Sequence, residues 1–114
     1  MTQYELARAY YVWLCNNCVY DEGIVSSSSL SHLAYSALVD GVAVCDGYTG
    51  AYDLLLRLEG IECTALMNAD HIWTVAELDG KTYHIDTTWG DQGTRVDMSF
   101  FGMTEAQSRA KHAW

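Results

Sequence analysis

The sequence GVAVCDGYTGAY, residues 41–52, lies near the middle of the chain and decides the fold that we expect. A short apolar run leads to Cys45, and apolar residues then recur at three- and four-residue steps, which is typical of a helix. Cys45 is therefore predicted at or just before a helix N-terminus, where unpaired N–H groups and the helix dipole favour a thiolate. Gly47 would let a substrate or another backbone come close to it. A buried structural cysteine is the alternative interpretation of this stretch taken alone.

Length and composition are those of a single globular domain. The chain has 114 residues, half of them hydrophobic, so we expect one domain over residues 1–114 with a core of its own. No apolar run has the length of a membrane span, and nothing resembles a signal peptide. The formal charge of −9 argues against nucleic acid and anionic membranes as partners. It mildly favours cationic substrates, although an acidic surface also simply keeps a protein soluble.

The other three cysteines are predicted to be structural. Cys15 and Cys18 form a C-x-x-C pair, which is compatible with a redox motif or with half of a zinc site. The pair lies late in a helical pattern, and no second pair of ligands follows at a regular spacing, so structural thiols are favoured. Cys63 lies in an apolar, strand-like run and is expected in the core.

Helical patterns flank a predicted sheet. Thr2 is placed to cap a first helix that ends near Asn17, and the helix that follows Cys45 ends near Gly60. The remaining predicted segments are an extended piece at 19–21, a serine-rich loop at 26–29, a helix at 30–39, strands at 61–67, 71–78, 81–89 and 98–103, and a helical segment at 104–112.

Asp79-Gly80, between two β-rich runs, is a strong signal for a hairpin with a two-residue loop. In that register Leu78 pairs with Lys81. The same register predicts two pairs near the open end of the hairpin, His71 with Thr88 and Trp73 with Asp86.

The predicted register brings a histidine and a carboxylate together. His71 and Asp86 become diagonal neighbours on one face of the sheet, close enough for a hydrogen bond between their side chains. A carboxylate there would fix the tautomer of the imidazole. His84 falls on the same face but opposes Val75, nearer the turn, and is not expected to take part. Either residue alone would more often be structural.

Two blocks, GVAVCDGY at 41–48 and DHIWTVAELDGKTYHIDTTW at 70–89, resemble the core of the transglutaminase-like superfamily, in its bacterial form. The resemblance extends from about Leu6 to the tail that ends at Trp114. It implies that Cys45 is the nucleophile, His71 the general base and acid, and Asp86 the orienting carboxylate. It also implies a papain-like α+β fold, in which N-terminal helices include the nucleophile helix and pack on a small antiparallel sheet.

The resemblance implies a cysteine-dependent hydrolase of amide or peptide bonds that works through a thioester and takes a protein or peptide substrate. The alternative is a transglutaminase, in which an amine resolves the thioester, because the same three residues serve both reactions. No cofactor or metal is expected, calcium included. The chain is short for this family, so we expect it to be a domain excised from a larger protein, and a secreted or cell-surface parent is compatible with the sequence.

Two further classes of function remain open at this point. A non-catalytic binding module on the same fold is one, although such proteins typically lose part of the triad and here all three positions are filled. A metal site made of Cys45, His71 and Asp86 is the other, since these residue types can bind zinc.

Overall fold

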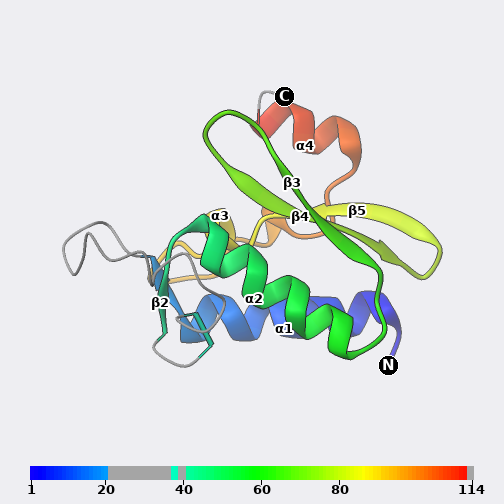
Figure 1. The fold of residues 1–114 in the computed structure, drawn as a ribbon, viewed down its shortest axis with the longest axis horizontal. Coiled ribbons are helices and arrows are strands. Elements are labelled where there is room, and N and C mark those ends of the chain that lie inside the picture. The colour runs from blue at the N-terminus through cyan, green and yellow to red at the C-terminus, as the bar shows by residue number, and fades with distance from the viewer. Residues whose placement is uncertain (21–36, 39–40, 113–114) are drawn as a thin grey trace.

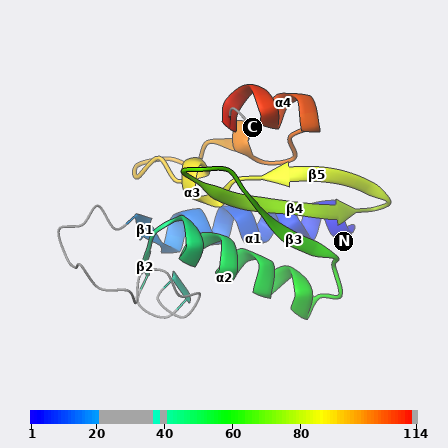
Figure 2. The ribbon, with the colours of Figure 1, turned by 45° about the horizontal axis from the view of Figure 1, so that its top comes forward.

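The computed structural model describes residues 1–20, 37–38 and 41–112, so the predicted loop at 26–29 and nearly all of the predicted helix at 30–39 lie outside the described residues. Its centre is a three-stranded antiparallel sheet in the order β3-β4-β5. Helices α1 and α2 lie on one side of the sheet and α4 on the other (Figure 1, Figure 2). The main elements are α1 (Gln3–Asn17), α2 (Cys45–Leu58), β3 (Cys63–Met67), β4 (Ile72–Leu78), β5 (Lys81–Ile85) and α4 (Glu105–His112). The predicted α+β architecture is therefore confirmed.

The core lies between the sheet and the two long helices. Alternate residues of β4, among them Ala76 and Leu78, are buried on the side that faces α2, as the period of a strand requires. Tyr52 of α2 is fully buried and its hydroxyl donates to the carbonyl of Ala7 in α1, at 2.7 Å. The hydroxyl of Thr74 in β4 donates to Asp53 of α2 at 2.5 Å. These contacts fix α2, and with it the position of Cys45, relative to the sheet.

The predicted hairpin register is confirmed as far as the ladder extends. Leu78 pairs with Lys81, and the ladder runs to the pair of Thr74 with Ile85. Asp79 and Gly80 have φ of 53° and 82°, the left-handed conformations that a tight two-residue hairpin turn requires.

The predicted strand at 81–89 is wrong beyond Ile85. Asp86 is the N-cap of a short helix, α3 (Thr87–Gly90), and its side chain accepts the N–H of Trp89 at 3.0 Å. This local bond competes with extension of the ladder, because an aspartate that bonds a backbone N–H three residues later starts a helical turn. The pairs predicted beyond this point, Trp73 with Asp86 and His71 with Thr88, are therefore absent from the ladder.

Two other sequence predictions need correction. The predicted strand at 98–103 is a 3₁₀ turn, η3 (Met98–Phe100), followed by a single bridge between Met103 and His84. Asp97 causes this by accepting the N–H of Ser99, which caps the turn. Cys63, expected in the core, is only partly buried at the start of β3.

A short parallel pair of strands leads the chain to Cys45. β1 (Val19–Tyr20) follows α1 and pairs with β2 (Val42–Ala43), with Tyr20 opposite Ala43. The start of α2 at Cys45 and the left-handed Gly60 just after its end agree with the sequence prediction. None of the helices in the described ranges is long and apolar enough to cross a membrane.

The hairpin turn is tied to the first turn of α1. Thr2 caps this helix by accepting the N–H of Glu5, and the Glu5 side chain accepts the N–H of Thr2, as a capping box does. The Asp79 carboxylate accepts the N–H groups of Gln3 and Tyr4 at 3.2 and 3.1 Å. One turn residue therefore satisfies two of the helix N–H groups that have no partner within the helix.

We predict that Asp79→Asn lowers the free energy of unfolding by about 0.5–1 kcal/mol, because the amide has one acceptor oxygen instead of two and no charge for the helix dipole. Asparagine tolerates the left-handed turn conformation, so the turn itself is kept. Urea unfolding followed by circular dichroism measures the loss. The matched control is Asp70→Asn, an exposed position, which should stay within about 0.5 kcal/mol of the parent. Equal stability of the two variants would contradict the capping role.

Candidate active site

Cys45 is the first residue of α2, directly after its N-cap Val44, and its side chain is partly exposed. The N–H groups of the first helical turn have no partner within the helix, so they and the helix dipole favour negative charge at this point. The thiol donates a hydrogen bond to the Asp46 carboxylate at 3.5 Å. Cys45 therefore combines partial exposure with a place at a helix N-terminus, where reactive cysteines are found.

His71 stands directly before β4, at the end of the sheet near the N-terminus of α2. Its backbone N–H donates to Asn68 Oδ1 at 2.8 Å, which holds the residue at the end of a tight turn. Its Nε2 lies 2.8 Å from Asp86 Oδ2, and its side chain also interacts with that of Cys45. Burial opposes the charged form, but the interactions with Asp86 and Cys45 outweigh it and raise the pKa of His71 to about 9.

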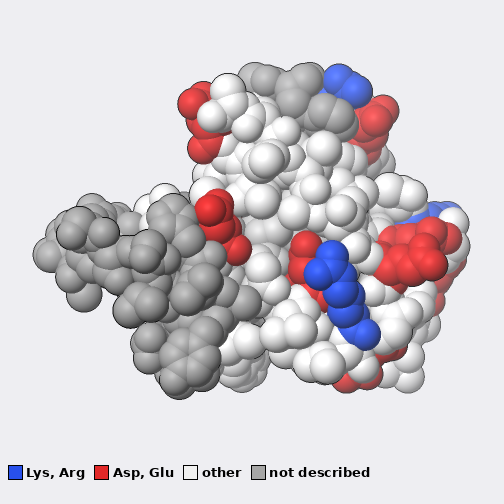
Figure 3. Space-filling view, viewed as in Figure 1, with Lys and Arg blue, Asp and Glu red and all other residues white. Residues whose placement is uncertain are grey.

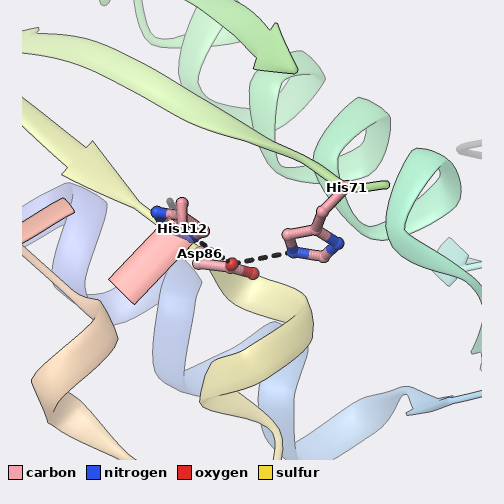
Figure 4. A group of neighbouring side chains, drawn as sticks. All are labelled: His71, Asp86 and His112. Atoms are coloured by element: carbon pink, nitrogen blue, oxygen red, sulfur yellow. Dashed lines mark hydrogen bonds and ion pairs between the residues drawn. The ribbon is translucent and has the colours of Figure 1, made fainter. Parts of the chain in front are cut away.

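Asp86 is fully buried and accepts three hydrogen bonds. Oδ1 accepts from the N–H of Trp89 at 3.0 Å, and Oδ2 accepts from the Nε2 atoms of His71 and His112, both at 2.8 Å (Figure 4). Burial alone would raise the pKa of this carboxyl, but the bonds from His112 and His71 reverse the effect and lower it. Asp86 is therefore ionised at neutral pH.

This ionised carboxylate determines the tautomer of His71. A carboxylate can only accept, so Nε2 of His71 must carry a proton. In the neutral ring Nδ1 is then unprotonated, and it is the nitrogen left to interact with Cys45. The arrangement can accept the thiol proton at Nδ1 and hold the resulting imidazolium beside Asp86, which is the chemistry of an activated thiol nucleophile.

His112 is a fourth member of the cluster that the sequence predictions missed. It is the last residue of α4, and its ring contacts both Asp86 and Ser108, four residues earlier on the same helix. One signal could have indicated it: α4 contains no large apolar side chain, and a helix must still bury one face. Its buried residues are Ser108 and His112, which are polar and therefore need hydrogen-bond partners.

Two tryptophans enclose the histidine rings. Trp89 stacks on His71 with ring centroids 4.3 Å apart and planes 5° from parallel. Trp73 stacks on His112 at 3.8 Å and 3°. The flat faces exclude water from the carboxylate, and the face of Trp89 also favours a protonated His71 ring through its quadrupole.

His84 lies elsewhere on the same face of the sheet, as predicted. It pairs with Val75, is buried, and accepts the Trp73 indole N–H at its Nδ1, at 3.1 Å. Its pKa is lowered, chiefly because it is buried, so it is a neutral packing residue at pH 7.

One group in the described part of the chain could offer three metal-ligand atoms, namely His71, Asp86 and His112, whose ligand atoms lie within 4.8 Å of one another. It does not include Cys45, unlike the metal site considered from the sequence. Both imidazoles are already bonded to Asp86, so the cluster is satisfied as a hydrogen-bond network.

On the face shown in Figure 3, acidic side chains are dispersed over the surface, with much uncharged surface between them.

We compared the chain with models of protein families and with curated proteins. The family model described as transglutaminase-like superfamily matches residues 1–114. Among curated proteins, the chain is 27% identical over 108 residues to the human kyphoscoliosis peptidase, covering 78% of this chain and 16% of that protein. The mouse kyphoscoliosis peptidase is 25% identical over 103 residues, covering 75% of this chain and 16% of that protein. The chain thus spans about 16% of the length of these relatives.

Two solved structures share the fold. A TGase crystal structure superposes with a TM-score of 0.68 at 17% identity, covering 82% of this chain and 28% of that one. A candidate cysteine protease from Cytophaga hutchinsonii superposes with a TM-score of 0.55 at 21% identity, covering 72% of this chain and 30% of that one.

We predict that iodoacetamide at neutral pH modifies Cys45 before the other cysteines, as peptide mapping by mass spectrometry would show. Cys45 is partly exposed and paired with His71. Burial raises the pKa of Cys15 to about 12 and that of Cys18 and Cys63 to about 11, so these thiols stay protonated. Equal labelling of all four cysteines, or faster labelling of Cys63, would contradict the assignment of Cys45.

We also predict that stability falls as pH rises from about 7 to 9. The pKa of His71 is about 9 in the folded protein and about 6.5 in an unfolded chain. Its contribution is therefore complete below pH 6.5 and is lost as pH rises through about 9, with a slope of at most about 1.4 kcal/mol per pH unit. Urea unfolding at several pH values measures this slope. His71→Gln, which cannot bind the proton, should have a flatter profile, and identical slopes would contradict the raised pKa.

Proposed function

Because this chain belongs to the transglutaminase-like superfamily, we propose that it carries a cysteine-dependent catalytic site that cleaves amide or peptide bonds through a thioester on Cys45. The observation that carries the proposal is the position of His71, which bonds the buried Asp86 through Nε2 and interacts with the side chain of Cys45. That is the order of contacts that an acyl-transfer triad needs. The substrate is then a protein or a peptide.

In the first half of the reaction the Cys45 thiolate attacks the carbonyl carbon of the substrate amide. The tetrahedral intermediate collapses, the C–N bond breaks, and the proton on Nδ1 of His71 passes to the departing amine. The acyl group remains on Cys45 as a thioester. Backbone N–H groups at the start of α2 are suitably placed to stabilise the developing oxyanion, as helix N-termini do.

In the second half His71 is neutral and accepts a proton from the attacking water. The water oxygen bonds to the thioester carbon, the C–S bond breaks, and a carboxylic acid leaves, which restores the thiolate and imidazolium pair. Asp86 keeps its charge throughout and holds His71 in one tautomer. The relatives named as peptidases support hydrolysis as the outcome.

Transfer to an amine is the second candidate. An amine that replaces water in the second half would give a new amide, and the formal charge of −9 would attract a cationic amine. A glutamine-containing peptide, assayed by mass spectrometry with and without an added primary amine, separates the two outcomes. Release of ammonia with glutamate as the product indicates hydrolysis, and an amine adduct indicates transfer. With neither product and no trapped thioester, the chain would be a binding module.

We predict that His71→Ala and Cys45→Ala abolish thioester formation, because Cys45 supplies the proposed thiolate and His71 relays its proton. Asp86→Asn should lower the rate by up to about 10⁴-fold, because an amide can hold the imidazole in the wrong tautomer. Rates with one amide substrate, measured per mole of folded protein, check these losses. The control is His84→Ala, a buried histidine outside the proposed triad, which should keep most of the activity. An inactive His84→Ala beside an active His71→Ala would refute the assignment.

A further inference from the structure

His112 reaches the site from a separate element. Its Nε2 lies 2.8 Å from Asp86 Oδ2, the same oxygen that bonds His71, although 26 residues separate it from Asp86 in sequence. Its side chain is fully buried. Figure 4 shows the two imidazoles on opposite sides of the carboxylate. Asp86 is thus held from both sides, and His71 also interacts with Cys45.

The hydrogen bonds of His112 define what it does to Asp86. The ionised carboxylate can only accept, so Nε2 of His112 must donate. Its Nδ1 lies 2.9 Å from the hydroxyl and 3.0 Å from the backbone carbonyl of Ser108, which is fully buried. Both ring nitrogens therefore have hydrogen-bond partners, and the ring has a fixed orientation.

Asn68 ties the two histidines together. Its Oδ1 accepts the backbone N–H of His71 at 2.8 Å, and its Nδ2 donates to the backbone carbonyl of His112 at 2.6 Å. One side chain therefore sets the spacing of the elements that carry the two rings. A contact that served only to attach α4 to the sheet would not require a donor on each side of one carboxylate.

We propose that His112 is a positioning residue for the proposed triad, which acts by donating a hydrogen bond that keeps Asp86 ionised and Oδ2 aimed at His71. This proposal rests on the proposed function. The second donor makes Oδ2 a weaker base, so the proton shared with His71 stays on the imidazole during turnover. It also removes the freedom of the carboxyl group to rotate about its own side chain, so His71 Nδ1 remains directed at Cys45.

Several titratable groups face this cluster and would contribute to any pH profile. His71 and His112 contact Asp86 directly, and Cys45 acts through His71. Tyr11 and Cys15 of α1 interact with Asp86 electrostatically, and His84 of β5 with His112. The pKa values of Tyr11 and Cys15 are raised far above neutral, so these two groups do not titrate on the acid side.

The decisive comparison is between His112→Phe and His112→Gln. Phenylalanine keeps a flat ring against Trp73 but cannot donate, whereas glutamine loses the ring but can place its amide N–H near the position of Nε2. If His112 acts as a donor, kcat falls by about 10- to 100-fold in the Phe variant, the range typical of residues that orient a functional histidine. KM stays unchanged, and the Gln variant recovers to within a few-fold of the parent.

The pH dependence of Cys45 alkylation gives a second test, because a change in packing alone would not alter it. Without the His112 donor the pKa of Asp86 rises. The rate of Cys45 alkylation by iodoacetamide falls as the pH is lowered, and this fall is the acid limb of the profile. The acid limb should shift upward by about one pH unit in His112→Phe and return to the parent position in His112→Gln. Asp79→Asn, which changes a carboxylate in the hairpin turn that bonds the start of α1, is the control and leaves the acid limb unchanged. If His112→Phe does not fold, His112→Asn replaces it, because the shorter amide cannot reach Asp86.

Other results would overturn the proposal. One is a His112→Phe variant that is more active than His112→Gln. Another is an equal loss of kcat in both variants with no shift of the acid limb. A third is stoichiometric zinc in the parent protein that both variants lose. A parent that forms no thioester would instead refute the proposed function. In that case NMR still tests His112, because the protonated side-chain nitrogens of His71 should titrate differently in the parent and in His112→Phe.

Discussion

A negative charge buried at Asp86 is the constraint on which the site depends. An isolated carboxylate in a protein interior costs several kcal/mol, and it persists only where donors replace the lost water. Here the donors come from the start of α3, the residue before β4 and the last residue of α4. Three segments distant in sequence must therefore meet at one side chain. The meeting of these segments and the tautomer of His71 are linked by this one carboxylate.

Local signals in the sequence predicted much of this correctly. Cys45 at the start of a helix followed from an apolar run that changed to helical spacing, and the hairpin register followed from Asp79-Gly80 alone. Both features are decided by residues within a few positions of each other. The conformation at Asp86 was predicted less well, because Thr87 and Thr88 favour a strand by propensity. The capping bond to Trp89 and the need to satisfy a buried charge overrode that preference.

The proposed role of His112 could not be derived from the spacing of residues in the sequence. Core residues are recognised in a sequence by apolar spacing, and the buried face of α4 has none, since it consists of Ser108 and His112. Their burial makes sense only after Asp86 and Trp73 are placed opposite them. The packing of Cys45 against His71 is tertiary in the same way. The sequence suggested a role for each residue, and the tertiary fold places the two side chains within reach of each other.

The parallel pairing of β1 with β2 has a consequence for how the domain can diversify. It joins Tyr20 to Ala43, two residues before Cys45, so the chain leaves and returns at one place beside the proposed nucleophile. Closing a longer excursion between such fixed ends costs only about 0.6 kcal/mol for each doubling of its length. An insertion between these two strands should therefore leave the start of α2 in place, provided that it keeps the buried Ala37 and the bond from the Val19 N–H to the Gly41 carbonyl. New sequence could be acquired there while the geometry of the proposed site stays unchanged.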